Sequence, residues 1–413
     1  MTSWDSARAS AWEVVAACGE SGVLVAAAGS RLYPHVWTRD VGLAALGIAT
    51  PGAPPGAGQA LVRSLELIAR HQSELGRLPL KVDAAADRPV AENSAGIDGG
   101  PWFAVAVLAA ARALGRPAVA HLVEPARRAM LDTAHLDLDG SGLIVSPEAG
   151  DWADMLPHRH HVLYSNALHV AGLRALAHLV DDDPGEAAAL RARAGRAADR
   201  IDLLFWLGGA TSGADAGRRL AALADASPEW GISGQYASRW GEMPYYLPYV
   251  AFRAAGCHFD LVGNAIAILA GVAPPGRAGR ILQHADQVAI AAPAPSRTLD
   301  PPIYPGEEDW RDHFRWRNLC VPHQYQNGGA WPFAGALHAA ALVAAGRRED
   351  ARALADRLAA VCLDPAAPFP EWLHGRSGRS MGEVHQLWSA AGLLYAMACV
   401  DSGSTGAFAE LAA

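Results

Sequence analysis

The sequence predicts an all-α protein built as an (α/α)6 barrel, which is a double ring of helical hairpins. Apolar residues recur at positions i, i+3, i+4 and i+7 through most of the chain, and this is the period of an amphipathic helix. Alternating runs of strand length are absent. Helix pairs recur at roughly 45–60 residues without a strict solenoid motif, so about six hairpins fit the chain. An open helical array is the alternative arrangement.

The helical segments follow one another along the chain, separated by glycine and proline. A first amphipathic helix is expected within residues 1–15. The later helical segments are 64–75, 101–115, 166–180, 186–207, 264–272, 335–346, 349–363 and 385–400. Several of them are apolar on nearly every side, which is typical of an inner ring. Because no linker-like composition divides the chain, we expect a single domain over residues 1–413.

Composition excludes several classes of partner. Hydrophobic residues make up 51% of the chain and charged residues 18%, so a large core is expected. The net charge of −8 and the lack of a basic stripe argue against a nucleic-acid partner. Lys81 is the single lysine, and we interpret this scarcity as a codon bias. No apolar run approaches the ~20 residues that cross a bilayer, and no signal segment is recognised, so we expect a cytoplasmic protein without a membrane partner.

The sequence favours neither a metal nor a cofactor. The five cysteines are scattered and lack CxxC spacing, so we interpret them as buried small side chains. The run of His158, His160 and His161 has ligand-type residues, but such a run in a loop is more often incidental. We also find no GxSxG elbow, no GxGxxG after a strand and no P-loop.

Polar residues gather in short clusters, each directly before a helical segment. These clusters are 35–40, 91–103, 148–157, 301–316, 322–332 and 369–388. Two long irregular stretches, 76–98 and 293–330, contain or adjoin several of them, and loops of that length are usually functional. In a ring of hairpins the loops that precede the inner helices meet at one end, so we expect carboxylates from distant parts of the sequence to come together there.

Tryptophan is the most abundant aromatic residue, with thirteen copies against nine tyrosines and eight phenylalanines. Eight of the tryptophans lie in polar or Gly- and Pro-rich stretches: Trp37, Trp102, Trp152, Trp310, Trp316, Trp331, Trp372 and Trp388. Sugar rings stack on indole while their hydroxyls need polar partners, although large aromatics also simply close helix ends. Tryptophans together with two separated carboxylates are typical of glycoside hydrolysis.

The motifs resemble those of the alkaline/neutral invertases, glycoside hydrolase family 100. The segments IYPGEEDWR (303–311), QYQNGGAWP (324–332) and FPEWLHGRSGRSMGEVHQLWSAAGLL (369–394) are similar to successive motifs of that family. VWTRD (36–40), IDGGPWF (97–103) and FDLVGNAIAIL (259–269) resemble its earlier motifs, in the same order. DMLP (154–157) and VLYSNAL (162–168) are similar to segments of the related family 63 glucosidases.

The resemblance implies an (α/α)6 barrel and an inverting mechanism with an Asp acid and a Glu base. The acid corresponds best to Asp154 and the base to Glu371, while Asp151 remains a rival for the acid. We expect Arg39 to pair with a site carboxylate, since an unpaired buried charge is costly. The expected sugar-binding residues are Trp37, Arg39, Asp40, Asp98, Trp102, Asp151, Trp152, Tyr325, Gln326, Asn327, Trp331, His385 and Gln386.

Several positions depart from the invertase pattern. Met155 and Leu156 follow the acid where the family has two arginines, and Gln326 stands where it often has histidine. The residues after the base are Trp372, Leu373 and His374 instead of two aromatics and an aspartate. Because these changes fall among the sugar-recognition residues, sucrose does not follow as the substrate.

Three functions are therefore compared. The leading hypothesis is an inverting hydrolase for a small α-glucoside-like substrate, either a disaccharide or a sugar on a small polar aglycone. A sugar isomerase or epimerase of the same architecture would use histidines such as His323 and His385. A catalytically silent sugar-binding protein would keep the tryptophans and lose the acid or the base. The partner in each case is a small carbohydrate, and an oligomer is possible.

Overall fold

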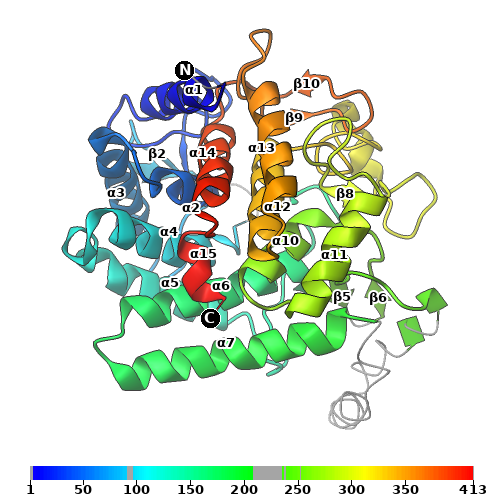
Figure 1. Ribbon diagram of the computed structural model, residues 1–413. Helices are drawn as coiled ribbons and strands as arrows, with labels where there is room; N and C mark the ends of the chain where they lie inside the picture. Colours follow the sequence, from blue (N-terminus) through cyan, green and yellow to red (C-terminus); the bar gives the residue numbers. More distant parts are fainter. Residues whose placement is uncertain (1–2, 91–95, 208–234, 237–238, 252, 413) are drawn as a thin grey trace.

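The computed structural model describes residues 3–90, 96–207, 235–236, 239–251 and 253–412. Within these residues, six helices form a closed inner ring, because each contacts the next and the last contacts the first (Figure 1). In ring order they are α2 (Thr38–Ile48), α4 (Gly99–Leu114), α6 (Leu163–Leu179), α10 (Leu261–Leu269), α12 (Pro332–Ala344) and α14 (Leu387–Ser402).

A second layer of helices covers this ring. Its members are α1 (Ser3–Cys18), α3 (Pro55–Arg70), α5 (Val123–Ala134), α7 (Pro184–Phe205), α11 (Pro275–Gln287) and α13 (Arg348–Cys362). Each of them packs on one or two inner helices; α13, for example, contacts α12 and α14. The predicted (α/α)6 barrel is thereby confirmed, and the open array is wrong. The single-domain organisation stays a prediction, since residues 208–234 lie outside the described part.

Short elements complete the described chain. The strands are two or three residues long: β1 (Val36–Trp37), β2 (Lys81–Asp83), β3 (Arg88–Pro89), β4 (His161–Val162), β5 (Tyr249–Ala251), β6 (Ala254–Ala255), β7 (Phe259–Asp260), β8 (Leu299–Asp300), β9 (Trp372–Leu373) and β10 (Ser380–Met381). Three 3₁₀ helices, η1 (Arg116–Ala118), η2 (Ala120–Leu122) and η4 (Asp312–Asn318), and the short helix α15 (Ala407–Leu411) are also described.

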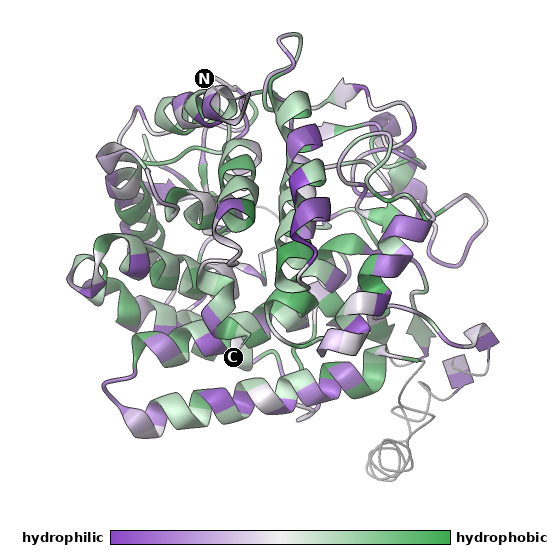
Figure 2. Cartoon of the chain, viewed as in Figure 1, coloured by the Kyte–Doolittle hydropathy of each residue, from purple (hydrophilic) through white to green (hydrophobic). Residues whose placement is uncertain are grey.

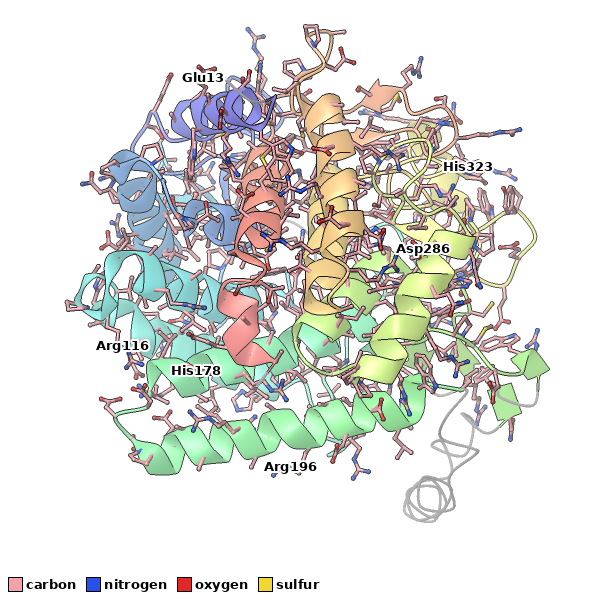
Figure 3. The ribbon with its side chains drawn as sticks, in the orientation of Figure 1. Glu13, Arg116, His178, Arg196, Asp286 and His323 are labelled. Carbon is pink, nitrogen blue, oxygen red and sulfur yellow. The ribbon has the colours of Figure 1, made fainter. Side chains whose placement is uncertain are left out.

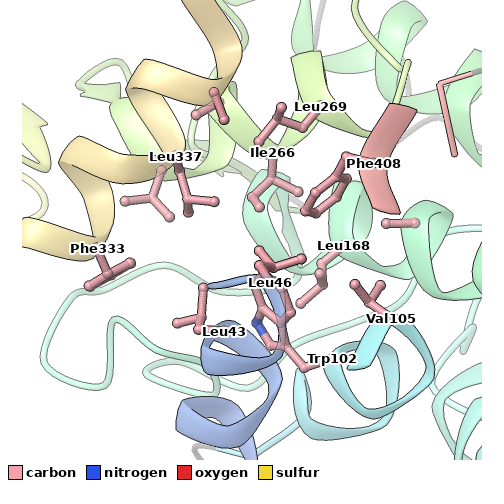
Figure 4. Close-up of a cluster of buried hydrophobic side chains, with 14 of the residues drawn as sticks. Leu43, Leu46, Trp102, Val105, Leu168, Ile266, Leu269, Phe333, Leu337 and Phe408 are labelled. Atoms are coloured by element: carbon pink, nitrogen blue, oxygen red, sulfur yellow. The ribbon is translucent and has the colours of Figure 1, made fainter. Parts of the chain in front are cut away.

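Hydropathy explains which helices lie inside. Every residue of α2 and α10 is buried, as expected for helices that are apolar on nearly all sides. In α13 the buried residues instead recur at helical spacing, from Ala351 through Leu354, Ala355 and Leu358. Figure 2 shows the result, since α7 and α13 each carry both colours along their length. At the centre, side chains from α2, α4, α6, α10, α12 and α15 meet in one apolar cluster (Figure 4).

The N-termini of the inner helices gather at one end of the barrel. The backbone N–H at the start of each of five inner helices donates to a carbonyl oxygen of another loop, in the pairs Thr38–Leu80, Leu163–Pro248, Leu261–Thr298, Trp331–Ser296 and Leu387–Ala26. The short strands add to these links; β1 pairs with β2 and β7 with β8, both antiparallel. These bonds satisfy helix-terminal donors and hold the polar loops side by side.

Two asparagines fix neighbouring loops to the ring in the same way. Asn264 of α10 accepts a hydrogen bond from the Tyr246 N–H at 3.0 Å and donates to Tyr246 O at 3.0 Å and Asp260 O at 2.8 Å. Asn166 of α6 makes the equivalent three bonds, with Ile144 N–H, Ile144 O and Val162 O. Both side chains are fully buried. Asn166 lies in the motif VLYSNAL and Asn264 in FDLVGNAIAIL, so each motif has a structural role in attaching a loop to the ring.

Replacing Asn264 with Ala tests this role. The change removes three hydrogen bonds and leaves the buried Tyr246 N–H and carbonyl oxygen without their amide partner, so we expect a loss of about 2–4 kcal/mol in the free energy of unfolding. Urea unfolding followed by circular dichroism measures it. The matched control is Gln283→Ala on the exposed face of α11, expected to stay within about 0.5 kcal/mol of the wild type. Equal stability of the two variants would contradict the role.

Candidate functional site

A buried ion pair joins the first turn of α2 to the residue before α4. Arg39 Nε lies 2.6 Å from Asp98 Oδ2, and Arg39 Nη2 lies 3.0 Å from Asp98 Oδ1. Arg39 is 6% exposed and Asp98 1%. Asp98 Oδ2 also accepts a hydrogen bond from Tyr164 OH, which in turn accepts one from Trp102 Nε1. The expectation that Arg39 pairs with a site carboxylate is confirmed.

Asp151 and Asp154 lie in one loop but in different surroundings. Asp151 is buried, and its two oxygens accept hydrogen bonds from Ala153 N–H and Ser165 Oγ. Burial and the neighbouring Asp98 raise the pKa of Asp151 to about 6. Asp154 is partly exposed, and Gln326 Nε2 donates to its Oδ1 at 3.0 Å. In the part of the chain that the structure describes, no other residue donates to the Asp154 carboxylate, so one oxygen is left for a ligand.

Gln326 holds the loop that carries Asp154. Its Nε2 donates to Trp152 O at 2.6 Å, and its Oε1 accepts a hydrogen bond from Met155 N–H at 2.9 Å. Burial raises the pKa of Asp154, although the Gln326 hydrogen bond opposes the shift. Gln326, which is one of the residues that differ from the invertase pattern, is therefore in direct contact with the expected acid.

Glu371 lies directly before β9 and is 4% exposed. Tyr33 OH donates to its Oε1 at 2.9 Å, and Glu383 N–H donates to its Oε2 at 3.1 Å. Burial raises the pKa of Glu371 to about 7, and the negative charges of Glu383 and Asp154 act in the same direction. The hydrogen bonds from Glu383 N–H and Tyr33 OH lower it, because they stabilise the ionised form.

The carboxylates of distant segments share one electrostatic neighbourhood. Burial raises the pKa of Tyr33 strongly, and the charges of Glu371, Asp40 and Asp154 raise it further. Burial also raises the pKa of Asp40 to about 7, where the Arg39 charge opposes the shift and the Glu371 charge adds to it. The charge of the buried Arg39 acts on Asp40, Asp98, Asp151 and Asp154, and Glu371 joins the same group through the charges of Asp40 and Asp154.

Sequence reasoning missed three residues of this region. Tyr33 precedes the 35–40 cluster by two positions, and only its hydrogen bond to Glu371 identifies it. Asp260 ends β7 and caps α10 by accepting from Val262 N–H; burial raises its pKa to about 7 and the Asp151 charge adds to this. Lys81, interpreted above as compositional, is buried with its Nζ 4.4 Å from the centre of the Trp37 ring. The available signals were the position of Tyr33 just before the 35–40 cluster, of Lys81 within the irregular stretch 76–98 and of Asp260 within the motif 259–269.

The expected aromatic residues divide into two groups. Trp152, Trp331 and Tyr325 form one network; the Trp152 and Trp331 centroids are 5.8 Å apart and those of Tyr325 and Trp331 5.0 Å. Phe333 and Trp388 extend it through a stacked pair at 4.8 Å. The other two expected aromatic residues, Trp37 and Trp102, lie outside this network.

Trp37 and Trp102 are those two residues. One face of Trp37 is covered by Lys81, and Tyr33 lies edge-on at 6.1 Å, so a sugar could reach only its other face. Trp102 is fully buried and belongs to the central apolar cluster (Figure 4). It acts on the site through Tyr164 and not as a stacking surface.

The last three expected residues also differ in role. Asn327 is fully buried, and its amide bonds Ile303 N–H, Ile303 O and Cys320 O, so it organises its own loop. Gln386 precedes α14 and is 1% exposed, and its buried Nε2 has no partner among the described residues. The backbone N–H of His385 donates to Pro368 O, and its carbonyl accepts from Ala28 N–H.

Among the described residues, no group of three or more His, Cys, Asp or Glu could hold a metal ion. The His run is used structurally instead. His161 contacts Asp139 Oδ2 at 3.1 Å, and His158 is buried beside Tyr249, so burial lowers its pKa to about 3. No described helix is long and apolar enough to cross a membrane.

Comparison with known proteins supports the resemblance. Residues 243–402 match the family model for alkaline and neutral invertase. The fold is similar to the family 63 mannosylglycerate hydrolase from Thermus thermophilus in complex with glucose, with a TM-score of 0.68 and 16% identity over 94% of this chain and 99% of that one. No curated protein matches significantly.

Other glycosidase structures share the fold. A bacterial glucoamylase complexed with acarbose has a TM-score of 0.65 and 13% identity over 98% of this chain and 57% of that one. A rhamnosidase from Klebsiella oxytoca with rhamnose bound has a TM-score of 0.61 and 14% identity over 93% of this chain and 63% of that one. At these identities the likeness establishes the architecture.

The Arg39–Asp98 pair yields a stability prediction. Arg39→Met leaves Asp98 as a buried, uncompensated charge, so the free energy of unfolding should fall by about 3–5 kcal/mol. Adding Asp98→Asn removes that charge and should recover part of the loss. Urea unfolding measures both variants.

The control for this experiment is an exposed ion pair. Arg116 contacts Asp181 and donates to His178 O on the outer surface (Figure 3), and the two side chains are about half exposed. Arg116→Met should change stability by less than about 1 kcal/mol. If Arg39→Met were as mild, the pair would not organise this end of the barrel.

Proposed function

We propose that this protein is an inverting glycoside hydrolase for a small α-glucoside-like substrate, with Asp154 as the general acid and Glu371 as the general base. Two carboxyl groups from distant hairpins carry the proposal, since both have raised pKa values and the charge of each acts on Tyr33. Inverting glycosidases use such a pair on opposite sides of the sugar ring.

Asp154 is favoured over Asp151 as the acid by its surroundings. A general acid must reach the glycosidic oxygen, so it needs an accessible oxygen that no protein group occupies. Asp154 is partly exposed with one oxygen open, whereas both Asp151 oxygens accept hydrogen bonds inside the protein. Asp151 instead supports the loop through Ser165 and Ala153.

Glu371 suits the role of base. Its hydrogen bonds from Tyr33 and Glu383 each leave further lone pairs on the carboxylate for a water molecule. A pKa of about 7 makes the ionised form a much stronger base than an ordinary glutamate while leaving it populated at neutral pH. The water that it activates attacks the anomeric carbon as Asp154 protonates the leaving oxygen.

The substrate class rests on comparison and on the departures from the invertase motifs. The Thermus thermophilus relative is named for a sugar linked to glycerate, and its structure contains glucose. Met155 and Gln326 stand beside Asp154, where the leaving group of the substrate would lie. We therefore favour a glucoside with a small polar aglycone alongside disaccharides such as sucrose. The proposed place of this reaction is the cytoplasm.

The alternatives have less support. An isomerase would need a histidine base among the site carboxylates, but His323 Nε2 contacts Tyr304 OH, and the charged residues that act on it are His374, Arg297, Arg376 and Asp300. A silent sugar-binding protein would be expected to lack one member of the carboxylate pair, and both are present here.

Incubation with sucrose, trehalose, isomaltose, kojibiose and glucosylglycerate tests the function. We expect one of these to release free sugar with inverted anomeric configuration. Proton NMR spectra recorded from the first minutes of the reaction measure that configuration. Glu371→Gln should lower turnover at least about 10³-fold while sugar binding persists, since the amide keeps the shape but not the basicity. Retained configuration, or full activity of Glu371→Gln, would overturn the mechanism.

The acid is identified by leaving-group dependence. Asp154→Asn should impair poor leaving groups strongly and spare an activated glycosyl fluoride, which needs no protonation. Asp151→Asn is the matched comparison, and it should show no such dependence. The reverse pattern would assign the acid to Asp151. The two carboxyl groups should lie roughly 6.5–9.5 Å apart, which leaves room for the water.

The pH profile tests the surroundings of Glu371. Because the base must be ionised, kcat/KM should fall as the pH drops through about 7, which is the pKa of Glu371. Tyr33→Phe removes a hydrogen bond that stabilises the ionised form of Glu371. The acidic limb of the pH profile, in which kcat/KM falls, should therefore move to higher pH by up to about one unit.

Tyr246→Phe is the control for that shift. Tyr246 OH also donates to a carboxylate, that of Asp202, but Asp202 lies on the outer helix α7. This variant should leave the limb unchanged. A limb near the ordinary value of glutamate, 4.5, or one that Tyr33→Phe does not move, would contradict the assignment.

A further inference from the structure

The loop that carries Asp154 is held by two other segments of the chain. We call residues 146–160 the Asp154 loop; two backbone hydrogen bonds of 2.7 and 2.8 Å between its first and last residues close it. Gln326 binds the loop next to Asp154, as described above. The segment 307–314 binds the same loop at two further points, and neither of them belongs to the expected site residues.

The first point is an ion pair between Arg311 and Glu148. Arg311 Nε lies 2.7 Å from Glu148 Oε1, and Arg311 Nη2 lies 3.0 Å from Glu148 Oε2, so the pair is bidentate. The remaining nitrogen, Nη1, donates to Trp310 O at 3.1 Å. Arg159, near the other end of the loop, lies 3.6 Å from Glu148. Because a bidentate pair fixes orientation as well as distance, it sets the place of Glu148 relative to the segment 307–314.

The second point is a hydrogen bond from His313 to the residue that follows the expected acid. His313 Nε2 lies 2.9 Å from Met155 O, and it is the donor because a carbonyl oxygen only accepts. Met155 N–H donates to Gln326 Oε1 at 2.9 Å. Both backbone polar groups of Met155 are therefore bound by side chains of two different segments. Since Asp154 is joined to Met155 by a rigid peptide unit, its backbone is held by the same contacts.

The segment 307–314 is itself fixed to the barrel. Phe314 is fully buried, and its ring lies 5.2 Å from that of Trp310. Asp309 is 7% exposed, and its Oδ1 accepts a hydrogen bond from Tyr249 OH at 2.5 Å. Tyr249 belongs to β5, which pairs with β4 directly after the Asp154 loop. Buried side chains thus hold the segment in place, so it can hold the loop in turn.

The two contacts contribute little to the stability of the fold. The Arg311 and Glu148 side chains are 25% and 36% exposed, and His313 is exposed. Ion pairs that are this accessible to water are screened and add little to the free energy of unfolding. The Arg311 hydrogen bonds lower the pKa of Glu148, and the charges of Arg311, Arg159 and His313 act in the same direction, so the pair is ionised at neutral pH. Its bidentate geometry therefore matters for position more than for stability.

We propose that Arg311 and His313 are positioning residues for the general acid. They hold Glu148 and Met155 O, and in this way they keep the open oxygen of Asp154 at the glycosidic oxygen of the substrate. The inference rests on the proposed function, in which Asp154 is the acid. A misplacement of about 1 Å in a reacting group can cost on the order of 10²-fold in rate, so contacts that hardly stabilise the fold can still govern catalysis.

Leaving-group dependence tests this role. Arg311→Met should lower kcat at least about tenfold for the disaccharide or glucosylglycerate that the protein hydrolyses, because the acid is misplaced. It should lower kcat less than about twofold for the glycosyl fluoride, which needs no protonation. KM should change little for either substrate. A merely structural role would lower both rates by the same factor, through the loss of folded protein.

A conservative variant and a matched control accompany this measurement. His313→Leu should behave like Arg311→Met, whereas His313→Gln should keep most of the activity, because an amide also donates to Met155 O. The control is Arg127→Met. Arg127 Nε and Nη2 lie 2.7 and 3.0 Å from the two oxygens of Glu186, which is the same geometry, but the pair joins α5 to α7. This variant should keep the wild-type kcat for both substrates.

Hydrogen exchange measures the loop without any substrate. In Arg311→Met, the backbone amides of residues 146–160 should exchange at least about threefold faster in mass spectrometry, while those of the inner helices stay unchanged. Arg127→Met should leave the exchange of the Asp154 loop as in the wild type. A protein without hydrolase activity would contradict the proposed function, and the exchange would still decide whether the segment 307–314 fixes the loop.

Three results would overturn the inference. The first is exchange in residues 146–160 that folded Arg311→Met leaves unchanged. The second is an equal loss of kcat for the poor leaving group and the fluoride. The third is wild-type kcat in both Arg311→Met and His313→Leu. If Arg311→Met does not fold, His313→Leu, which removes one exposed contact, decides through the same measurements.

Discussion

The buried pair of Arg39 and Asp98 is the interaction on which the carboxylate end of the barrel depends. It joins the start of α2 to the start of α4 and supplies the positive charge at the centre of a group of acidic side chains. The N-termini of the inner helices add partial positive charge at the same end. Without these contributions, burying Asp40 and Asp151 beside Asp98 would be prohibitive.

The positive charge only partly offsets the cost of burying these acidic side chains, and the pKa values of several of them are raised as a result. The pKa values of Asp40, Asp260 and Glu371 are raised to about 7, so the folded protein binds protons that the unfolded chain has released. The resulting loss of stability is absent below their ordinary values near 4 and complete above about 7. Closed packing of the two helical rings offsets it, and carboxyl groups suited to proton transfer at neutral pH result.

Local surroundings assign different tasks to chemically similar groups. Asp98 is neutralised, Asp260 caps a helix, Asp151 supports a loop, and Asp154 keeps an open oxygen. The same division applies to the tryptophans, since Trp102 is part of the core whereas Trp152 and Trp331 belong to the network beside Tyr325. Residue type alone does not distinguish these roles.

The sequence by itself determined the architecture, and it predicted which loops carry the candidate site. Helical periodicity and the all-round apolar segments are local properties, and they predicted both rings. Asp98, Asp154 and Glu371 lie in segments that precede inner helices, as expected, whereas Arg39 lies in the first turn of α2. Boundaries were less accurate, since the segment expected at 64–75 belongs to a helix that runs from Pro55 to Arg70.

Only the tertiary structure decided which side chains meet. The hydrogen bond of Tyr33 to Glu371, the structural role of Asn327 and the burial of Lys81 on Trp37 all join segments whose distance in space is set by ring closure. Periodicity tells which face of a helix is buried, because burial follows from the residues of that helix. It does not tell which partner lies opposite, because that depends on the packing of helices from the whole chain.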